Sequence, residues 1–388
     1  MVAPMASRKG KALVAMSGGV DSSVAAALLL REGYEVVGCF MRLGSPGEAF
    51  EEGLADPGAA CDADARRIGH RGCCSVGDAA DARLVAAQLG IPFYVCNFKR
   101  EFGRIMDYFA DEYAAGRTPN PCVRCNDWLK FGKLFDYALQ IDADCIASGH
   151  YARIDRSSGG GAARLARGVD GAKDQSYVLF GLPSTRLGSM LLPIGDLEKP
   201  RVRELAQEMG LPVFNKPDSQ EICFVPDDDY AGFVERRRPD LAGTGGEIVE
   251  QETGRAVGRH EGHHRFTIGQ RRGVQVALGR PVYVVGKDIA TNTVLVGDRD
   301  RLEVSAVSAS EVNWHAEPSA DWRPCHAQFR AHGAPAPAMC RVVDGALEVR
   351  FEAPQIGVAP GQAIVCYEGD VVLGGGWIVR AGRSDNAE

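Results

Sequence analysis

Residues 16–23 read Met-Ser-Gly-Gly-Val-Asp-Ser-Ser, and this stretch decides the fold. An apolar run precedes it at residues 12–16, and an apolar, helix-like run follows at residues 24–30. The order predicts a strand, a tight glycine turn and the start of a helix. Two glycines let backbone N–H groups converge on an anion, because neither carries a Cβ atom. Three serines add hydroxyl donors, and the helix directs its positive end at the same point, so we expect a phosphate-binding loop.

This loop is not a Walker A motif, since no Gly-Lys-Ser/Thr closes it. An ordinary glycine turn would need only one or two of the residues present. We therefore favour the phosphate-binding interpretation over a purely structural turn.

Strand-like and helix-like segments alternate through the first part of the chain. We expect strands at residues 11–16, 34–41, 91–96 and 144–148, and helices at residues 21–32, 78–89 and 127–140. Such alternation predicts an α/β fold with a doubly wound parallel sheet, in which ligands bind at the carboxyl ends of the strands. Residues 43–71 fit neither element, and we expect a surface excursion or a mobile lid there.

The pattern changes at about residue 229, where short alternating segments with glycine turns begin. Residues 347–352 alternate between apolar and charged, which predicts a half-buried strand, and residues 363–367 and 371–373 predict a hairpin. We expect three domains: a catalytic domain at residues 1–228, a small mixed or β-rich middle domain at residues 229–298 and a C-terminal β-barrel at residues 299–388.

The formal charge of −7 disfavours a polyanionic partner when taken alone. Two segments differ from this average: residues 253–273 contain five arginines and one acid, and residues 117–133 contain four cations and one acid. They favour a confined nucleic-acid track, with a solvated basic face as the alternative. We expect His260, His263 and His264 to be solvated or to face RNA rather than to bind a metal.

No apolar run is long enough for a signal peptide core or a membrane span, so we expect a cytoplasmic protein with no membrane partner. Twelve cysteines in a reducing compartment are not expected to form structural disulfides. Cys39, Cys96 and Cys145 lie in apolar, strand-like runs, where buried and inert thiols are expected.

Cys122 and Cys125 lie between two prolines and a helix expected to begin at about Asp127, capped by Asn126 or Asp127. A positive helix terminus and nearby cations lower the pKa of a thiol. A structural zinc site would need a fourth ligand, and a thioredoxin-like pair would need a preceding strand. The alternative is a working pair of Cys125 and Cys223, in which Cys122 assists or all three bind an iron–sulfur cluster.

Together with further stretches, these motifs resemble the tRNA-specific 2-thiouridylases of the PP-loop ATP-pyrophosphatase superfamily. The glycine loop alone would indicate only the superfamily. The resemblance runs nearly end to end, through residues 40–41, 118–126, 148–153, 167–170, 173–177, 218–224, 267–273 and 360–362. It implies ATP-dependent 2-thiolation of the wobble uridine in tRNA: ATP adenylates O2 with release of pyrophosphate, and sulfur then displaces AMP. The target base must be splayed out to reach the pocket.

The resemblance also implies roles for individual residues. Cys223 would carry a persulfide, Cys125 would attack it or close a disulfide as product leaves, and Asp21 would contact Mg²⁺. The expected ATP-binding residues are Ala15, Met16, Ser17, Gly18, Gly19, Val20, Asp21, Ser22, Met41 and Gly149. The expected tRNA-binding residues are Asn120, Pro121, Cys122, His150, Lys173, Asp174, Gln175, Arg330 and Gln362. Sulfur would come from a sulfur-delivering protein or a sulfide source, and we expect the free protein to be a monomer.

Two positions depart from the family pattern. Cys122 stands where the best-known members have an aspartate thought to act as acid and base, which suits an iron–sulfur cluster held by Cys122, Cys125 and Cys223. Ala331 stands where a tyrosine is usual after Arg330, which puts the tRNA contact there in doubt.

Two other functions compete with this one. Another AMP-forming enzyme of the superfamily, such as a tRNA lysidine synthetase or an amidating synthetase, would deliver nitrogen and need no paired cysteines. An RNA-binding module with a relic nucleotide fold is disfavoured by the intact glycine loop.

Overall fold

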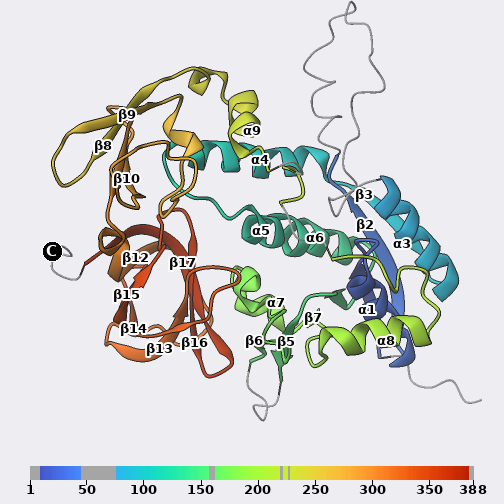
Figure 1. The fold of residues 1–388 in the computed structure, drawn as a ribbon. Coiled ribbons are helices and arrows are strands. Elements are labelled where there is room, and N and C mark those ends of the chain that lie inside the picture. Colours follow the sequence, from blue (N-terminus) through green and yellow to red (C-terminus); the bar gives the residue numbers. More distant parts are fainter. Residues whose placement is uncertain (1–8, 45–75, 157–161, 219–221, 226–227, 384–388) are drawn as a thin grey trace, which may run out of the picture. The chain divides into compact units, whose positions relative to one another are not determined.

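The computed structural model describes residues 9–44, 76–156, 162–218, 222–225 and 228–383 (Figure 1). The chain divides into two compact units. The first comprises residues 1–104 and 124–228, and the second comprises residues 105–123 and 229–388. Within the described ranges, no helix has the length and apolar character needed to cross a membrane.

The first unit is built on a five-stranded sheet in the order β3-β2-β1-β4-β7, with every pairing parallel. Residues 12–14 of the central strand are fully buried, as a strand covered on both faces requires. This sheet confirms the expected α/β class. The strands are β1 (Lys11–Ala15), β2 (Glu35–Arg42), β3 (Phe93–Asn97), β4 (Cys145–Ser148) and β7 (Met190–Leu191).

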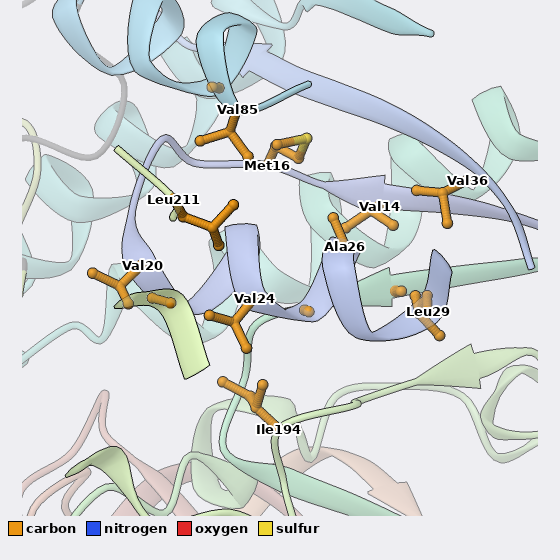
Figure 2. Close-up of a cluster of buried hydrophobic side chains, with 14 of the residues drawn as sticks. Val14, Met16, Val20, Val24, Ala26, Leu29, Val36, Val85, Ile194 and Leu211 are labelled. Carbon is orange, nitrogen blue, oxygen red and sulfur yellow. The ribbon is translucent and has the colours of Figure 1, made fainter. Parts of the chain in front are cut away.

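Helices cover this sheet and supply about half of the buried residues in its core. α1 packs against β1 and α8, and its Val24 is fully buried among Val14, Ile194 and Leu211 in one apolar cluster (Figure 2). Burial of one such side chain contributes about 1.5–3 kcal/mol. The helices of this unit include α1 (Val20–Arg31), α3 (Val76–Leu89), α6 (Leu134–Gln140), α7 (Ser184–Leu187) and α8 (Lys199–Glu208), with a 3₁₀ turn at Ser176–Leu179 and a hairpin of β5 (Ala152–Asp155) and β6 (Arg164–Arg167).

Two cysteines of the sheet contact each other. Cys39 is buried in β2, and its Sγ atom lies 3.0 Å from that of Cys96 in β3, which is only partly buried. The hydrogen bond that the Cys39 thiol donates to Cys96, together with burial, raises the pKa of Cys39. Cys145 is also partly buried, and burial raises the pKa of its thiol to about 11. Cys39 is buried as expected, and the raised pKa keeps its thiol protonated. Cys96 and Cys145 are only partly buried, so the expectation that they are buried was wrong.

The second unit includes the end of helix α4 (Lys99–Ala114), which packs on residues from the second half of the sequence. The ring centroids of Phe109 and of Phe233 in α9 (Tyr230–Arg237) lie 5.7 Å apart. Those of Tyr108 and Trp377 lie 6.0 Å apart. These contacts explain why residues 105–123 belong with the second half of the sequence.

A four-stranded mixed sheet follows α9, in the order β10-β11-β8-β9. Its strands are β8 (Gly246–Glu250), β9 (Ala256–His260), β10 (Tyr283–Asp288) and β11 (Thr293–Gly297). His260, His263 and His264 are buried beside this sheet, so the expectation that they are solvated or face RNA was wrong. His263 bonds to Asn292, and His264 bonds to Glu235.

The chain ends in a closed antiparallel barrel in the order β12-β15-β14-β13-β16-β17, with β17 pairing back to β12. The expected strand at residues 347–352 is present, with its apolar residues buried in the barrel core. The strands are β12 (Glu303–Trp314), β13 (Arg323–Gln328), β14 (Ala336–Val343), β15 (Ala346–Ile356), β16 (Ala363–Glu368) and β17 (Val371–Gly382). The expected excursion at residues 43–71 lies almost wholly outside the described residues.

Candidate active site

The glycine loop joins β1 to α1 in a conformation that requires glycine. Gly18 has a φ of +74°, and a Cβ atom there would lie 2.2 Å from the carbonyl oxygen of Asp78. The backbone N–H of Ser17 donates to Ser22 Oγ at 3.1 Å, which fixes the turn. Among the described residues no side chain caps α1, so the N–H groups of its first turn are available to an anion.

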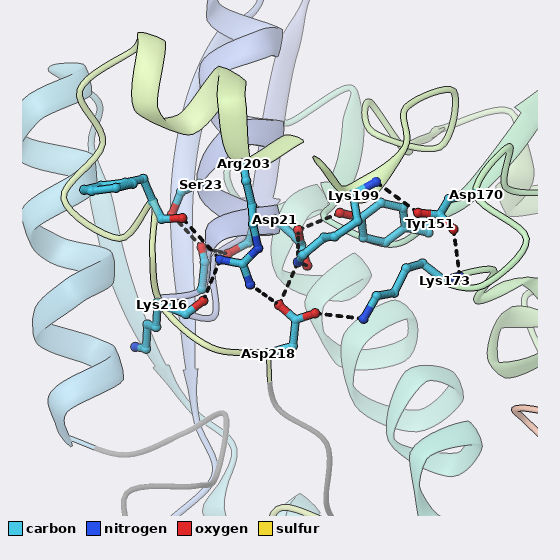
Figure 3. A network of polar contacts seen from close by, with 12 residues as sticks. Asp21, Ser23, Tyr151, Asp170, Lys173, Lys199, Arg203, Lys216 and Asp218 are labelled. Atoms are coloured by element: carbon cyan, nitrogen blue, oxygen red, sulfur yellow. Dashed lines mark hydrogen bonds and ion pairs between the residues drawn. The ribbon is translucent and has the colours of Figure 1, made fainter. Parts of the chain in front are cut away.

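Asp21, in the first turn of α1, is held by two side chains from distant parts of the chain. Lys199 Nζ lies 2.8 Å from each of its carboxylate oxygens, and the Tyr151 hydroxyl donates to Oδ1 at 2.8 Å (Figure 3). Burial and the adjacent Asp21 carboxylate raise the pKa of Tyr151, so its hydroxyl stays protonated and remains a donor.

Asp218 gathers three cations at the same place. Lys173, Lys199 and Arg203 lie 2.9, 2.8 and 2.8 Å from its carboxylate oxygens (Figure 3). Partial burial raises the pKa of Asp218, but the hydrogen bonds from Lys199 and Lys173 outweigh it and lower the pKa to about 2. Lys199 therefore bridges two carboxylates that are far apart in sequence.

Lys216 ties the glycine loop to helix α3. Its Nζ atom donates to the carbonyl oxygen of Gly18 at 3.0 Å and lies 2.6 Å from both Asp78 and Asp81. Burial lowers the pKa of Lys216, but the bonds to the two aspartates raise it overall. The loop is thus preorganised by a cation that stays charged.

The residues after β4 meet the glycine loop from a second strand end. A Cβ atom at Gly149 would lie 2.5 Å from the backbone nitrogen of Ser22, so only glycine permits this approach. His150 accepts or donates a bond of 2.7 Å with Ser148, and burial lowers the pKa of its imidazole well below the usual range. His150 is therefore neutral and inside the unit.

The expected ATP-binding residues all lie at or near the carboxyl ends of β1, β2 and β4, which are neighbours in the sheet. Ala15 ends β1 and Met16 follows it, Met41 is near the end of β2, and Gly149 follows β4. Open parallel sheets bind their ligands at this edge. The structure thus brings these residues together.

The helix expected to begin at about Asp127 begins earlier, at Pro121, so that expectation was wrong. The helical segment consists of α5 (Pro121–Arg124), a π-helical stretch (Cys125–Lys133) and α6. Asn120 Oδ1 accepts from the backbone N–H of Val123 at 3.4 Å, and proline suits the first helical position. The cap is therefore Asn120, and Cys122 and Cys125 lie within the helical segment rather than in a loop before it.

Cys125 and Cys223 belong to the first unit, and both are half-buried. Cys223 stands in the described stretch 222–225, where the adjacent Phe224 packs on Phe102 with ring centroids 5.7 Å apart. Cys122 is exposed and belongs to the second unit. The arrangement of the three cysteines around a cluster therefore stays a prediction.

Three models of one enzyme family match the chain in succession. They are described as the tRNA methyl transferase HUP domain at residues 10–227, the tRNA methyl transferase PRC-barrel domain at residues 232–298 and the aminomethyltransferase β-barrel domain at residues 304–378. A tRNA-specific 2-thiouridylase of Rhodopirellula baltica is 48% identical, with 96% of each chain covered. One of Geotalea uraniireducens is 45% identical, with 98% of each chain covered.

The chain belongs to the tRNA-specific 2-thiouridylase family. The resemblance expected from the sequence is confirmed, and with it the expectation that the chain is an enzyme.

The residues of this chain that are expected to bind tRNA lie in different environments. Asp174 accepts from Arg167 and from the backbone N–H of Gly168, and Gln175 accepts from the backbone N–H of Tyr151. In the second unit, Gln362 donates to the carbonyl oxygens of Thr118 and Pro119, next to Asn120 and Pro121, and Arg330 bonds to the carbonyl oxygens of Ile356 and Gly357. Their contacts with tRNA stay predictions.

Sequence reasoning missed Lys199, Arg203 and Lys216. One signal for Lys199 was available: it stands in the first turn of a helix, where the macrodipole disfavours a cation. A cation at an electrostatically unfavourable position, with no partner nearby in sequence, is a candidate for a role at a functional site.

Proposed function

We propose that the chain catalyses ATP-dependent 2-thiolation of the wobble uridine in tRNA. The uridine O2 attacks the α-phosphorus of ATP and pyrophosphate leaves, after which sulfur attacks C2 and AMP leaves with the former O2. The observation that carries the proposal is the glycine loop with its open helix terminus, in a chain that matches 2-thiouridylases along nearly its full length.

The loop and its cations supply the electrostatics that this first step needs. Negative charge develops on the α- and β-phosphate oxygens as their bond breaks, and preorganised donors at that point stabilise the transition state. The first-turn N–H groups of α1 provide neutral donors. The side chains of Lys173, Lys199 and Arg203 provide three cations, which pair with the carboxylates of Asp21 and Asp218. A third carboxylate, Asp170, accepts from the backbone N–H groups of the two lysines.

Asp21 can contact Mg²⁺ with one oxygen. Among the described residues, Lys199 makes two contacts with it and Tyr151 makes one, and a carboxylate has about four lone-pair positions. A single carboxylate contact suits Mg²⁺, which keeps several waters and binds the substrate phosphates. When bound, the ion would neutralise charge on the leaving pyrophosphate.

The sulfur step is assigned to two cysteines. The terminal sulfur of a Cys223 persulfide attacks C2 of the adenylated base, and AMP leaves. The Cys125 thiolate then attacks Cys223 Sγ, so that the bond between Cys223 and the transferred sulfur breaks and a Cys125–Cys223 disulfide forms. A dithiol reductant and a sulfur donor restore the starting state. Both cysteines are in the first unit, together with the glycine loop.

Cys122 would assist this step in one of two ways. Its thiol can move a proton, or it can join Cys125 and Cys223 as the third ligand of an iron–sulfur cluster with one iron open for sulfide. The cluster is our working hypothesis, because Cys122 replaces the aspartate expected at this position.

Transfer RNA would meet the chain partly through its basic segments. Arg271 and Arg272 are exposed, whereas Arg265 is paired with Glu235. Binding through phosphates releases counterions, so the affinity for tRNA should fall steeply between low and moderate salt. An affinity that is independent of salt would remove these segments from the proposed contact.

The experiment that tests the proposal follows ATP cleavage. Anaerobic protein is incubated with ATP, Mg²⁺ and an unmodified tRNA that has uridine at the wobble position, and AMP and pyrophosphate are quantified. The matched control is the same tRNA with cytidine at that position. The proposal expects AMP and pyrophosphate with uridine only. Equal cleavage with both tRNAs, or release of ADP and phosphate, would contradict it.

A further inference from the structure

Three adjacent strands of the C-terminal barrel each place one cysteine in the barrel core. The strands lie in the order β14-β13-β16, and they contribute Cys340, Cys325 and Cys366. All three residues are buried and belong to one hydrophobic cluster. None of them has a part in the proposed thiolation, and they are distinct from the cysteines assigned to that reaction.

The pairing register brings the three side chains to one place. Cys325 is opposite Ala338, two residues before Cys340, and Cys366 is opposite Ala327, two residues after Cys325. The cysteines are therefore diagonal neighbours on the inner face. Cys325 and Cys366 are each opposite a buried alanine, whose small side chain leaves space near the sulfur atoms, whereas Cys340 is opposite Arg323 and Val349.

The sulfur atoms are spaced almost as metal ligands would be. All three Sγ atoms lie within 4.8 Å of one another. Three sulfurs bound at about 2.3 Å in a plane around one ion would be about 4.0 Å apart, so side-chain shifts of less than an ångström would close the site. The thiols already contact one another, since hydrogen bonds from Cys325 and Cys366 lower the pKa of Cys340.

The donor set selects the kind of ion. Among the residues that the structure describes, no imidazole or carboxylate joins this set of three ligand atoms. Sulfur ligands without oxygen or nitrogen favour soft ions and disfavour Mg²⁺, Ca²⁺ and Mn²⁺. Zn²⁺ almost always takes four ligands in structural sites, whereas three sulfurs satisfy Cu(I).

We propose that Cys325, Cys340 and Cys366 form a three-thiolate site for Cu(I) in the core of the barrel. Binding forms three Cu–S bonds and releases one proton from each thiol that ionises, with no change in the oxidation state of copper or sulfur. Arg323, next to Cys340 in the ladder, offsets part of the negative charge. The bound ion would link three strands and stabilise the folded barrel by mass action.

The test uses the full chain with Cys122, Cys125 and Cys223 changed to serine, so that these thiols cannot bind copper. Anaerobic protein receives Cu(I) in the presence of a chromogenic Cu(I) chelator and is then separated from unbound metal. We expect one equivalent of copper to be retained, with thiolate-to-copper absorption in the ultraviolet and an increased Tm.

Matched variants locate the bound ion. Cys340→Ala in the same background should release the copper and abolish the increase in Tm. Cys145→Ala, which changes a partly buried cysteine of the other unit, should leave both unchanged. Equal copper retention by the two variants, or no retained copper in the parent, would overturn the proposal. One equivalent of Zn²⁺ retained in place of Cu(I) would overturn the assignment of the ion.

A second measurement does not depend on folding of a variant. The parent is alkylated anaerobically with and without Cu(I) under partly denaturing conditions, and each cysteine peptide is quantified by mass spectrometry. Protection confined to the peptides that contain Cys325, Cys340 and Cys366 is expected. Protection of other cysteines without these three would contradict the site.

Discussion

The Nζ atom of Lys199 lies 2.8 Å from both carboxylate oxygens of Asp21. This contact joins the start of α8 to the start of α1, next to the glycine loop (Figure 3). Lys199 is almost fully buried and also contacts Asp218, so its charge is held at one point in space. We infer that Lys199 positions Asp21 and acts on the phosphates of ATP.

Lys199→Met should therefore lower kcat/KM for ATP by about 100-fold or more, because one fixed cation at a developing charge is lost. The rate of AMP formation in the presence of tRNA measures this effect. Arg201→Met is the matched control: Arg201 lies on the same helix but is exposed and bonds only to Glu204 and Glu208 in the described contacts. If both variants lose activity equally, the effect of Lys199 is not specific to the site.

Gly18→Ala should abolish ATP binding. The substitution adds a Cβ atom 2.2 Å from a carbonyl oxygen, at a φ of +74° that side chains rarely adopt. Gly33→Ala is the control, because Gly33 has a φ of +90° but no atom within 4 Å of the added Cβ. Gly33→Ala should cost about 1 kcal/mol of stability and leave ATP affinity unchanged. Calorimetric titration with ATP separates the two outcomes.

Asp218 should make stability depend on pH in the acid range. Its pKa of about 2 in the folded state is below the ordinary value of 3.8, so its ion pairs stabilise the fold fully above that value. This contribution, about 1 kcal/mol after solvent screening, is lost as pH falls through 2. The difference in free energy of unfolding between wild type and Asp218→Asn should shrink as pH falls from 5 to 2. A constant difference would contradict the assignment.

Cys125→Ser and Cys223→Ser should separate the two steps of the reaction. Neither replacement removes a group assigned to the phosphates, so AMP formation on the first turnover should persist while thiolated tRNA falls below detection. Cys145→Ser should retain both, since burial raises the pKa of the Cys145 thiol to about 11 and keeps it protonated. Full thiolation by both site variants would contradict the assignment of the sulfur step to Cys125 and Cys223.

Cys122→Asp distinguishes the two roles assigned to Cys122. If Cys122 is a cluster ligand, the wild type purified without oxygen should absorb in the visible range, and the variant should lose both this absorbance and its activity. Unchanged activity together with no iron absorbance in either protein would eliminate the cluster and leave proton transfer.

Local sequence was enough to predict the strand, glycine turn and helix at residues 11–31 and the parallel sheet. The glycines, serines and flanking apolar runs act within about ten residues of one another, and strand burial follows from apolar composition. The start of the helix at Pro121 was missed because Asn126 and Asp127 are also residue types that commonly cap helices. In the structure it is the Asn120 side chain that accepts from a backbone N–H of the first turn.

The contacts of Lys199 could not be predicted in this way. The lysine and Asp21 are 178 residues apart, and only the folded sheet brings them together. The burial of His260, His263 and His264 has the same cause, since their partners Asn292 and Glu235 lie on other elements. Residues 105–123 join the second unit through aromatic contacts that no local pattern reveals.

The most direct measurement of the central claim is the mass of the modified nucleoside. Anaerobic protein is incubated with ATP, Mg²⁺, a sulfide source and unmodified tRNA, and the RNA is digested to nucleosides and analysed by mass spectrometry. We expect a uridine whose mass corresponds to replacement of one oxygen by sulfur, formed only when ATP is present. Consumption of ATP with no such nucleoside would contradict the assignment of sulfur transfer to this chain.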